Sequence, residues 1–121
     1  MTEAEIQIID AARELIDANV RARDELDAAN QFLQRGIDHL ESGGSIIEAL
    51  TALPVSSRRQ ATQDAFKRVV EARHLLRLRA ISVCIDEGMR PSQIGETWGI
   101  SRQRVDHYIQ ELKAGPTSTP A

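Results

Sequence analysis

Residues 91–113 read PSQIGETWGISRQRVDHYIQELK. Pro91 suits the first turn of a helix, where its missing N–H group is not needed. Gly99 suits the residue that leaves that helix, because glycine adopts the left-handed conformation without steric cost. Ser101 then suits the residue that caps a second helix. These signals agree, so the stretch predicts two short helices joined by a tight turn.

The apolar residues of this stretch are spaced as in two helices that cross and share a small core. They are Ile94, Trp98, Ile100, Val105, Tyr108, Ile109 and Leu112. Gly95 lies one turn before Gly99, where two such helices come closest. We therefore expect a larger residue at Gly95 to push the helices apart.

This pattern resembles the bacterial helix-turn-helix regulators, and the run 99–105, GISRQRV, is similar to sigma-factor fourth regions and resolvase-type domains. The resemblance implies a tri-helical DNA-binding domain, here without a wing, because no strand pair is expected after the second helix. Two residues depart from the family pattern. Arg90 stands where a capping serine or threonine is common, and Trp98 is bulkier than the usual leucine.

Candidate DNA contacts lie on the face left outside when the apolar residues turn inward. Arg102 and Gln103 are the expected base readers, because arginine can bond guanine twice and glutamine can bond adenine twice. Ser101 would hold the helix end or a phosphate, and Arg104 would reach the DNA backbone. The remaining candidates are Asp106, His107, Gln110, Arg77 and Arg90. Alternatively, such a face is merely solvated or binds a protein.

Charge is divided unevenly along the chain, whose formal net charge is −3. Residues 1–56 hold 4 arginines against 11 carboxylates, whereas residues 57–121 hold 11 Lys and Arg against 7 carboxylates. Neutralising phosphates is the main source of non-specific DNA affinity. The C-terminal half is therefore the half expected to face DNA. Besides Arg77, candidate phosphate contacts on the third helix are Arg58, Arg59, Lys67, Arg68, Arg73 and Arg79.

Residues 2–41 contain no proline and only one glycine, Gly36, so they predict one long helix. At 1.5 Å per residue it would reach about 58 Å, so something must pack along it. One heptad frame, broken by polar residues, fits it. The frame comprises Ile9, Ile16, Arg23, Asn30 and Ile37 with Ala12, Asn19, Leu26, Leu33 and Leu40. The frame is either the seam of a dimer or an exposed face of a helix that packs within its own chain.

Two further helices are expected before the 91–113 stretch. Ser45 and Glu48 match a capping box that opens a short helix ending before Pro54. A third helix begins at Ser56 or Ser57 and runs to Gly88. Its expected apolar face comprises Ala61, Ala65, Phe66, Val69, Ala72, Leu76, Ala80 and Val83. The sequence thus predicts an all-α fold with a long N-terminal helix and a helical bundle. Residues 1–53 would form a dimerisation arm, 57–113 a DNA-binding domain and 114–121 a disordered tail.

Composition argues against several other classes of protein. Aromatic residues make up 3% of the chain, which favours an aliphatic core between helices. No signal peptide or membrane span is expected, and Cys84 is expected to be a buried thiol in a cytoplasmic, nucleoid-associated protein. The three histidines lack the spacing of a metal site, so no enzymatic activity and no cofactor is expected.

The sequence therefore predicts a sequence-specific double-stranded DNA-binding protein, a small transcriptional regulator that pairs through its N-terminal helices. Two alternatives stay open. An adaptor or antitoxin-like protein would use the acidic N-terminal helices to bind another protein. A sigma-like accessory would contact RNA polymerase, as the resemblance alone suggests.

Overall fold

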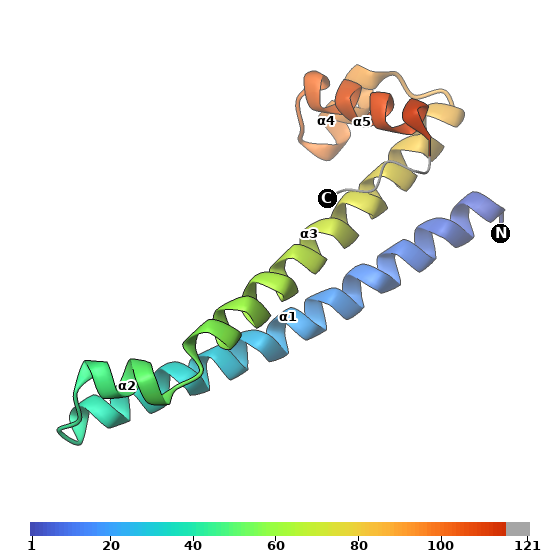
Figure 1. Cartoon of the computed structure of the whole chain (residues 1–121). Helices are drawn as coiled ribbons and strands as arrows, with labels where there is room; N and C mark the ends of the chain where they lie inside the picture. Colours follow the sequence, from blue (N-terminus) through green and yellow to red (C-terminus); the bar gives the residue numbers. More distant parts are fainter. Residues whose placement is uncertain (116–121) are drawn as a thin grey trace. The chain divides into compact units, whose positions relative to one another are not determined.

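The computed structural model describes residues 1–115, which form five α-helices and no strand (Figure 1). In chain order they are α1 (Glu3–Glu41), α2 (Ile46–Ala52), α3 (Val55–Asp86), α4 (Pro91–Trp98) and α5 (Arg102–Ala114). The predicted all-α class is confirmed. Helix α5 includes Ala114, so it runs one residue further than predicted, and residues 116–121 of the predicted disordered tail lie outside the described residues. Within 1–115, no helix is both long and apolar enough to cross a membrane.

The helices divide into two compact units. Unit 1 comprises residues 1–15 with the chain from residue 71 onward, and unit 2 comprises residues 16–70. The predicted division between residues 53 and 57 differs from this one, because α1 and α3 each run through both units. Each unit is described separately below.

Unit 1 contains all of the large side chains that are fully buried in residues 1–115. Its core comprises Leu78 and Ile81 of α3, Ile94 of α4, and Val105 and Tyr108 of α5. Half-buried side chains pack around this core: Cys84, Ile85, Met89, Trp98, Ile100, Ile109 and Leu112. Every apolar residue predicted to share a core between the two short helices therefore does so, and Cys84 is half-buried beside it.

The ends of α4 and α5 are fixed as the sequence predicts. Gly99 ends α4 in the left-handed conformation, with φ of 68°. The Ser101 hydroxyl oxygen accepts a hydrogen bond from the Arg104 backbone N–H at 3.1 Å and so caps α5. The departure at Arg90 is compensated by Gln93, whose side-chain oxygen accepts the Arg90 backbone N–H at 2.9 Å. An arginine side chain has no acceptor, so this is one half of a capping box.

Gly95 lies where the turn after α4 comes closest to that helix. A Cβ atom there would lie 2.9 Å from the Ile100 carbonyl oxygen, which belongs to the backbone and cannot rotate away. We expect Gly95→Ala to lower the free energy of unfolding by about 1–3 kcal/mol, as overpacking does. Chemical denaturation measures this change. Gly36→Ala is the matched control, because Gly36 lies inside α1 with nothing within 4 Å of the added atom, and it should stabilise the chain by roughly 0.5–1 kcal/mol. Equal effects of the two substitutions would contradict this account.

A 3.5-residue repeat runs through the buried and half-buried positions of α1. Its members are Ile8, Ala11, Leu15, Ala18, Ala22, Glu25, Ala29, Phe32, Gly36 and His39, and Ile9, Ala12 and Ala28 are half-buried beside it. In unit 1, Arg79 of α3 donates a hydrogen bond to the Gln7 carbonyl oxygen at 3.0 Å. In unit 2, Arg58 of α3 pairs with Glu25 at 2.7 Å. Helix α1 therefore packs within its own chain, along a seam rich in alanine.

The predicted heptad frame lies one residue further along α1 than this observed seam. Its larger members Ile16, Leu26, Leu33, Ile37 and Leu40 are exposed. In the single chain, α1 packs against α3 and leaves most of this frame at the surface. On α3, Phe66 was predicted to face inward but is 46% exposed. Small residues at the seam let two helices approach closely, which leaves the larger side chains outside.

Candidate nucleic-acid interface

The outer face of α5 carries most of the predicted site residues. Val105 and Tyr108 point into the core and are at most 2% exposed. The side chains on the other faces are exposed, namely Arg102, Gln103, Arg104, Asp106, His107 and Gln110. The helix thus presents a polar surface whose first turn contains two arginines and a glutamine. Arg90 is also exposed, at the residue that caps α4.

Arg77 of α3 and Arg104 of α5 converge on Tyr108. The Arg104 guanidinium carbon lies 5.9 Å from the centre of the Tyr108 ring, within the range of a cation–π contact. Burial raises the pKa of the Tyr108 hydroxyl, but hydrogen bonds and positive charge from Arg77 and Arg104 together outweigh it. The pKa is therefore lower than the usual value of a tyrosine. Two guanidinium groups therefore lie close to Tyr108.

Tyr108 is the only tyrosine in the chain, so its ionisation can be followed directly by absorbance near 295 nm. We expect it to ionise at lower pH in the folded protein than in the chain unfolded in urea. The folded state then binds fewer protons than the unfolded state across this alkaline interval, so stability should rise with pH there. Arg77→Ala should raise the pKa of Tyr108, because a hydrogen bond and a positive charge that favour the ionised form are lost. A folded Tyr108 that ionises at higher pH than the unfolded one would contradict the arrangement.

His74 and Glu111, which are not among the predicted site residues, lie together beside Tyr108 and the predicted residue His107. The His74 Nε2 atom of α3 lies 2.8 Å from one carboxylate oxygen of Glu111 on α5, and the His107 Nε2 atom lies 4.0 Å from the other oxygen. The His74 ring also packs against Tyr108, with centroids 5.2 Å apart. His74 and Glu111 are 37 positions apart, so no local spacing could have identified them. A shallow depression lies here, lined by His74, Ser101, Gln103, Arg104, His107, Tyr108 and Glu111.

Two of the basic residues considered as phosphate contacts are engaged within the chain. Arg58 pairs with Glu25, and both side chains are largely buried. Arg79 holds the Gln7 carbonyl oxygen. These two arginines connect α3 to α1, so the expectation that they contact phosphate is not supported by their geometry. Arg77 and Arg104 retain that role because they lie beside the exposed face of α5.

Charge in the folded units does not follow the two halves of the chain. Unit 1 combines the basic C-terminal segment with residues 1–15, which contain four carboxylates and one arginine. From residue 71 onward the chain holds seven Lys and Arg against six carboxylates. The surplus of basic residues at 57–70 belongs instead to unit 2. Unit 1 as a whole therefore lacks an excess of basic residues, and its exposed basic side chains from residue 71 onward are those of Arg73, Arg90, Arg102, Arg104 and Lys113.

Metal chemistry has no evident site in residues 1–115, where no three histidine, cysteine or acidic side chains are arranged to hold a metal ion. Comparison of the chain with protein-family models, with curated proteins and with solved structures finds no match.

Proposed function

We propose that the protein binds double-stranded DNA in a sequence-specific manner and acts as a small dimeric transcriptional regulator. In this proposal α4 and α5 form a helix-turn-helix with the end of α3 as the supporting helix, and α5 enters the major groove. The observation that carries it is the division of α5 into a face locked into the core and a face of free polar side chains. The fixed turn at Gly99 and the close approach at Gly95 hold that polar face at one angle.

Each side chain has a distinct role in the proposal. Arg102 and Gln103, on the first turn of α5, read base edges. Arg104 and Arg77 bind backbone phosphates beside that turn. Both guanidinium groups lie near Tyr108, whose single hydroxyl oxygen can accept only some of their N–H groups, so the remaining N–H groups are left to bind phosphate oxygens. Ser101 acts as the helix cap, since its hydroxyl oxygen already accepts the Arg104 N–H. Arg90, Asp106, His107 and Gln110 are exposed and remain candidates for flanking contacts.

Binding of the full chain to a labelled duplex of random sequence, followed by fluorescence anisotropy at several salt concentrations, tests the proposal. We expect binding at low salt that weakens as salt rises, since each neutralised phosphate releases counterions. Arg77→Ala should reduce the slope of log affinity against log salt by about 1, as for the loss of one phosphate contact. A chain that binds no duplex at low salt, or whose affinity does not change with salt, would refute it.

A further inference from the structure

Unit 2 has almost no core of its own. Its buried residues are Ala18, Ala22 and Ala49, and none of its large apolar side chains is buried. Twelve large apolar residues of the unit are at least 37% exposed: Ile16, Val20, Leu26, Leu33, Ile37, Leu40, Ile46, Ile47, Leu50, Val55, Phe66 and Val70. Unit 1 shows the opposite pattern, with Ile81, Ile94 and Val105 fully buried. Large apolar residues left outside in such numbers mark an interaction surface.

Most of these residues lie on one face of the α1–α3 pair. Ile16, Leu26, Leu33, Ile37 and Leu40 each follow a seam position of α1 by one residue. Phe66 and Val70 follow the less exposed Ala65 and Val69 of α3 in the same way. Within unit 2 these helices run antiparallel (Figure 1), so the same offset turns both sets of side chains to the same side. Val20 lies four residues after Ile16, at the edge of this face. Gln31 precedes the seam residue Phe32 by one residue and therefore lies on the other side of α1.

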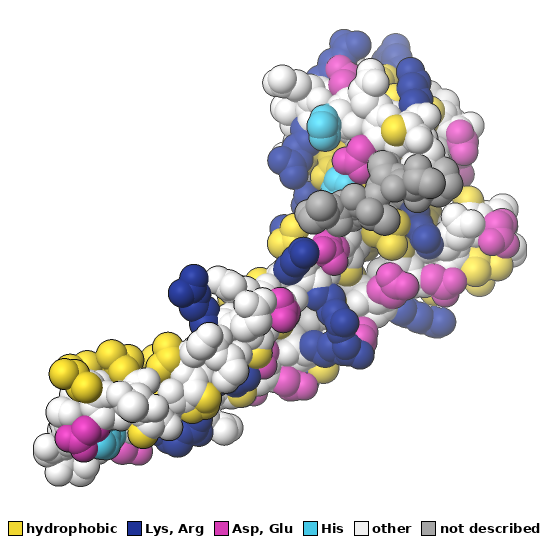
Figure 2. Space-filling view, in the orientation of Figure 1, with side chains coloured by type: hydrophobic (Ala, Val, Ile, Leu, Met, Phe, Trp, Pro, Cys, Tyr) yellow, Lys and Arg dark blue, Asp and Glu magenta, His cyan; other side chains and the backbone are white. Residues whose placement is uncertain are grey.

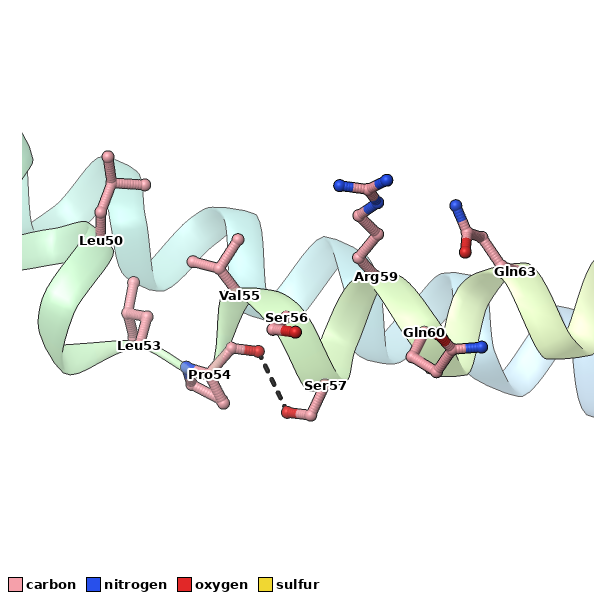
Figure 3. A pocket seen from close by; sticks show the side chains of 9 residues that line it. All are labelled: Leu50, Leu53, Pro54, Val55, Ser56, Ser57, Arg59, Gln60 and Gln63. Atoms are coloured by element: carbon pink, nitrogen blue, oxygen red, sulfur yellow. Dashed lines mark hydrogen bonds between the residues drawn. The ribbon is translucent and has the colours of Figure 1, made fainter.

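Helix α2 extends this face. Leu50 and Val55 point to the same side as Arg59 and Gln63 of α3 (Figure 3), and these two α3 residues follow Arg58 and Thr62 by the same one-residue offset. An open groove lies along them, lined also by Leu53 and Pro54. Ile46 and Ile47 share the outer side of α2 with Leu50, at spacings of four and three residues. Figure 2 shows the resulting apolar surface over α2.

We infer that a second copy of this chain covers this face, which we call the hairpin face: the seven named residues of α1 and α3 together with Ile46, Ile47, Leu50 and Val55. Two α1–α3 pairs stacked face to face make a four-helix bundle, the common way in which helical hairpins acquire a core. A self-complementary face of this kind fits a two-fold dimer.

The exposed area matches what a dimer needs. The eleven side chains of the hairpin face are about half exposed on average. If a fully exposed side chain of this kind offers roughly 100 Å² of apolar surface, the face offers on the order of 500 Å² per copy. A standard interface buries about 800 Å² per partner, of which about 60% is apolar. A second copy is therefore sufficient to cover the face without another partner. The inference deepens the proposed function, since a dimer presents two reading helices to a two-fold DNA site.

Sedimentation equilibrium of the full chain without DNA tests the inference. We expect a mass of twice 13.4 kDa at micromolar concentration. Leu33→Glu on α1 and Phe66→Glu on α3 should each weaken the dimer at least tenfold, because each places a charge in the bundle core. Gln31→Glu is the matched control, since Gln31 is exposed on α1 but lies on the side away from the hairpin face, and it should leave the dimer intact. The melting temperature of the wild-type chain should also rise with concentration.

A wild-type chain that is a monomer at 100 µM and melts independently of concentration would overturn the inference. So would a dimer that resists both Leu33→Glu and Phe66→Glu, or one that Gln31→Glu weakens equally. The DNA experiment separates this result from the proposed function. A monomeric chain that still binds duplex through Arg102 would leave DNA reading by α5 standing without the dimer, whereas a dimer that ignores DNA would leave only the dimer.

Discussion

Ile94→Ala is expected to lower the free energy of unfolding of the chain by about 2–5 kcal/mol, the cost of a cavity left by a large aliphatic side chain. Ile94 is fully buried and lies on α4, in the cluster that also contains Ile81 and Val105. The cavity would therefore loosen the contact that sets the angle of α5. Urea denaturation followed by circular dichroism and by the fluorescence of Trp98, the only tryptophan, measures the loss.

Ile16→Ala is the matched control for this substitution. It removes the same atoms from a side chain that is 61% exposed, so the change in unfolding free energy should stay within about 0.5 kcal/mol for the monomer. At concentrations where the hairpin face is paired, Ile16→Ala should cost more, because the residue is then covered. Similar losses from the two substitutions in dilute protein would mean that the cluster around Ile94 is not the core of unit 1.

Arg102→Ala and Gln103→Ala are each expected to weaken binding to a preferred duplex by about 1–3 kcal/mol. Each should relax the preference at particular base pairs, because the lost donors and acceptors face base edges. Both side chains are exposed in the free protein, so their removal should leave the unfolding free energy nearly unchanged. Anisotropy titrations against a set of duplexes that differ at single base pairs measure both effects.

Arg77→Ala is the control for base reading. It should weaken binding to every duplex by a similar factor, because Arg77 is assigned to the phosphate backbone. A raised pKa of Tyr108 in the Arg77→Ala chain would show independently that Arg77 lies beside Tyr108 in the wild-type protein. If all three substitutions weakened all duplexes uniformly, the assignment of Arg102 and Gln103 as base readers would be wrong.

Much of unit 1 could be predicted from sequence because its signals are local. Pro91, Gly95, Gly99 and Ser101 each act within one or two turns, and the apolar spacing of α4 and α5 identifies their core. The pair formed by His74 and Glu111 could not be predicted, since it depends on how α3 and α5 cross. The net charge of each half of the chain did not predict the charge of each folded unit, because folding places residues 1–15 in the same unit as the basic C-terminal segment.

The seam of α1 was missed for a different physical reason. Large aliphatic residues normally identify a buried seam, and here they define the frame of Leu33 and Ile37. The observed seam instead contains Ala11, Ala18 and Ala22, whose small side chains allow close packing but carry little hydrophobic signal. A second frame one residue away, equally regular and rich in alanine, was the available clue. The alanine-rich frame packs against α3, and the frame that contains Leu33 and Ile37 supplies most of the hairpin face.

In the proposed function, the polar face of α5 reads the sequence of a DNA duplex. Selection of bound sequences from a pool of random duplexes by the full chain tests it most directly, since it asks for binding, base preference and site symmetry together. We expect an enriched site with two-fold symmetry whose half-site preference changes in the Arg102→Ala and Gln103→Ala chains. Recovery of a pool with the same composition as the starting duplexes would contradict it.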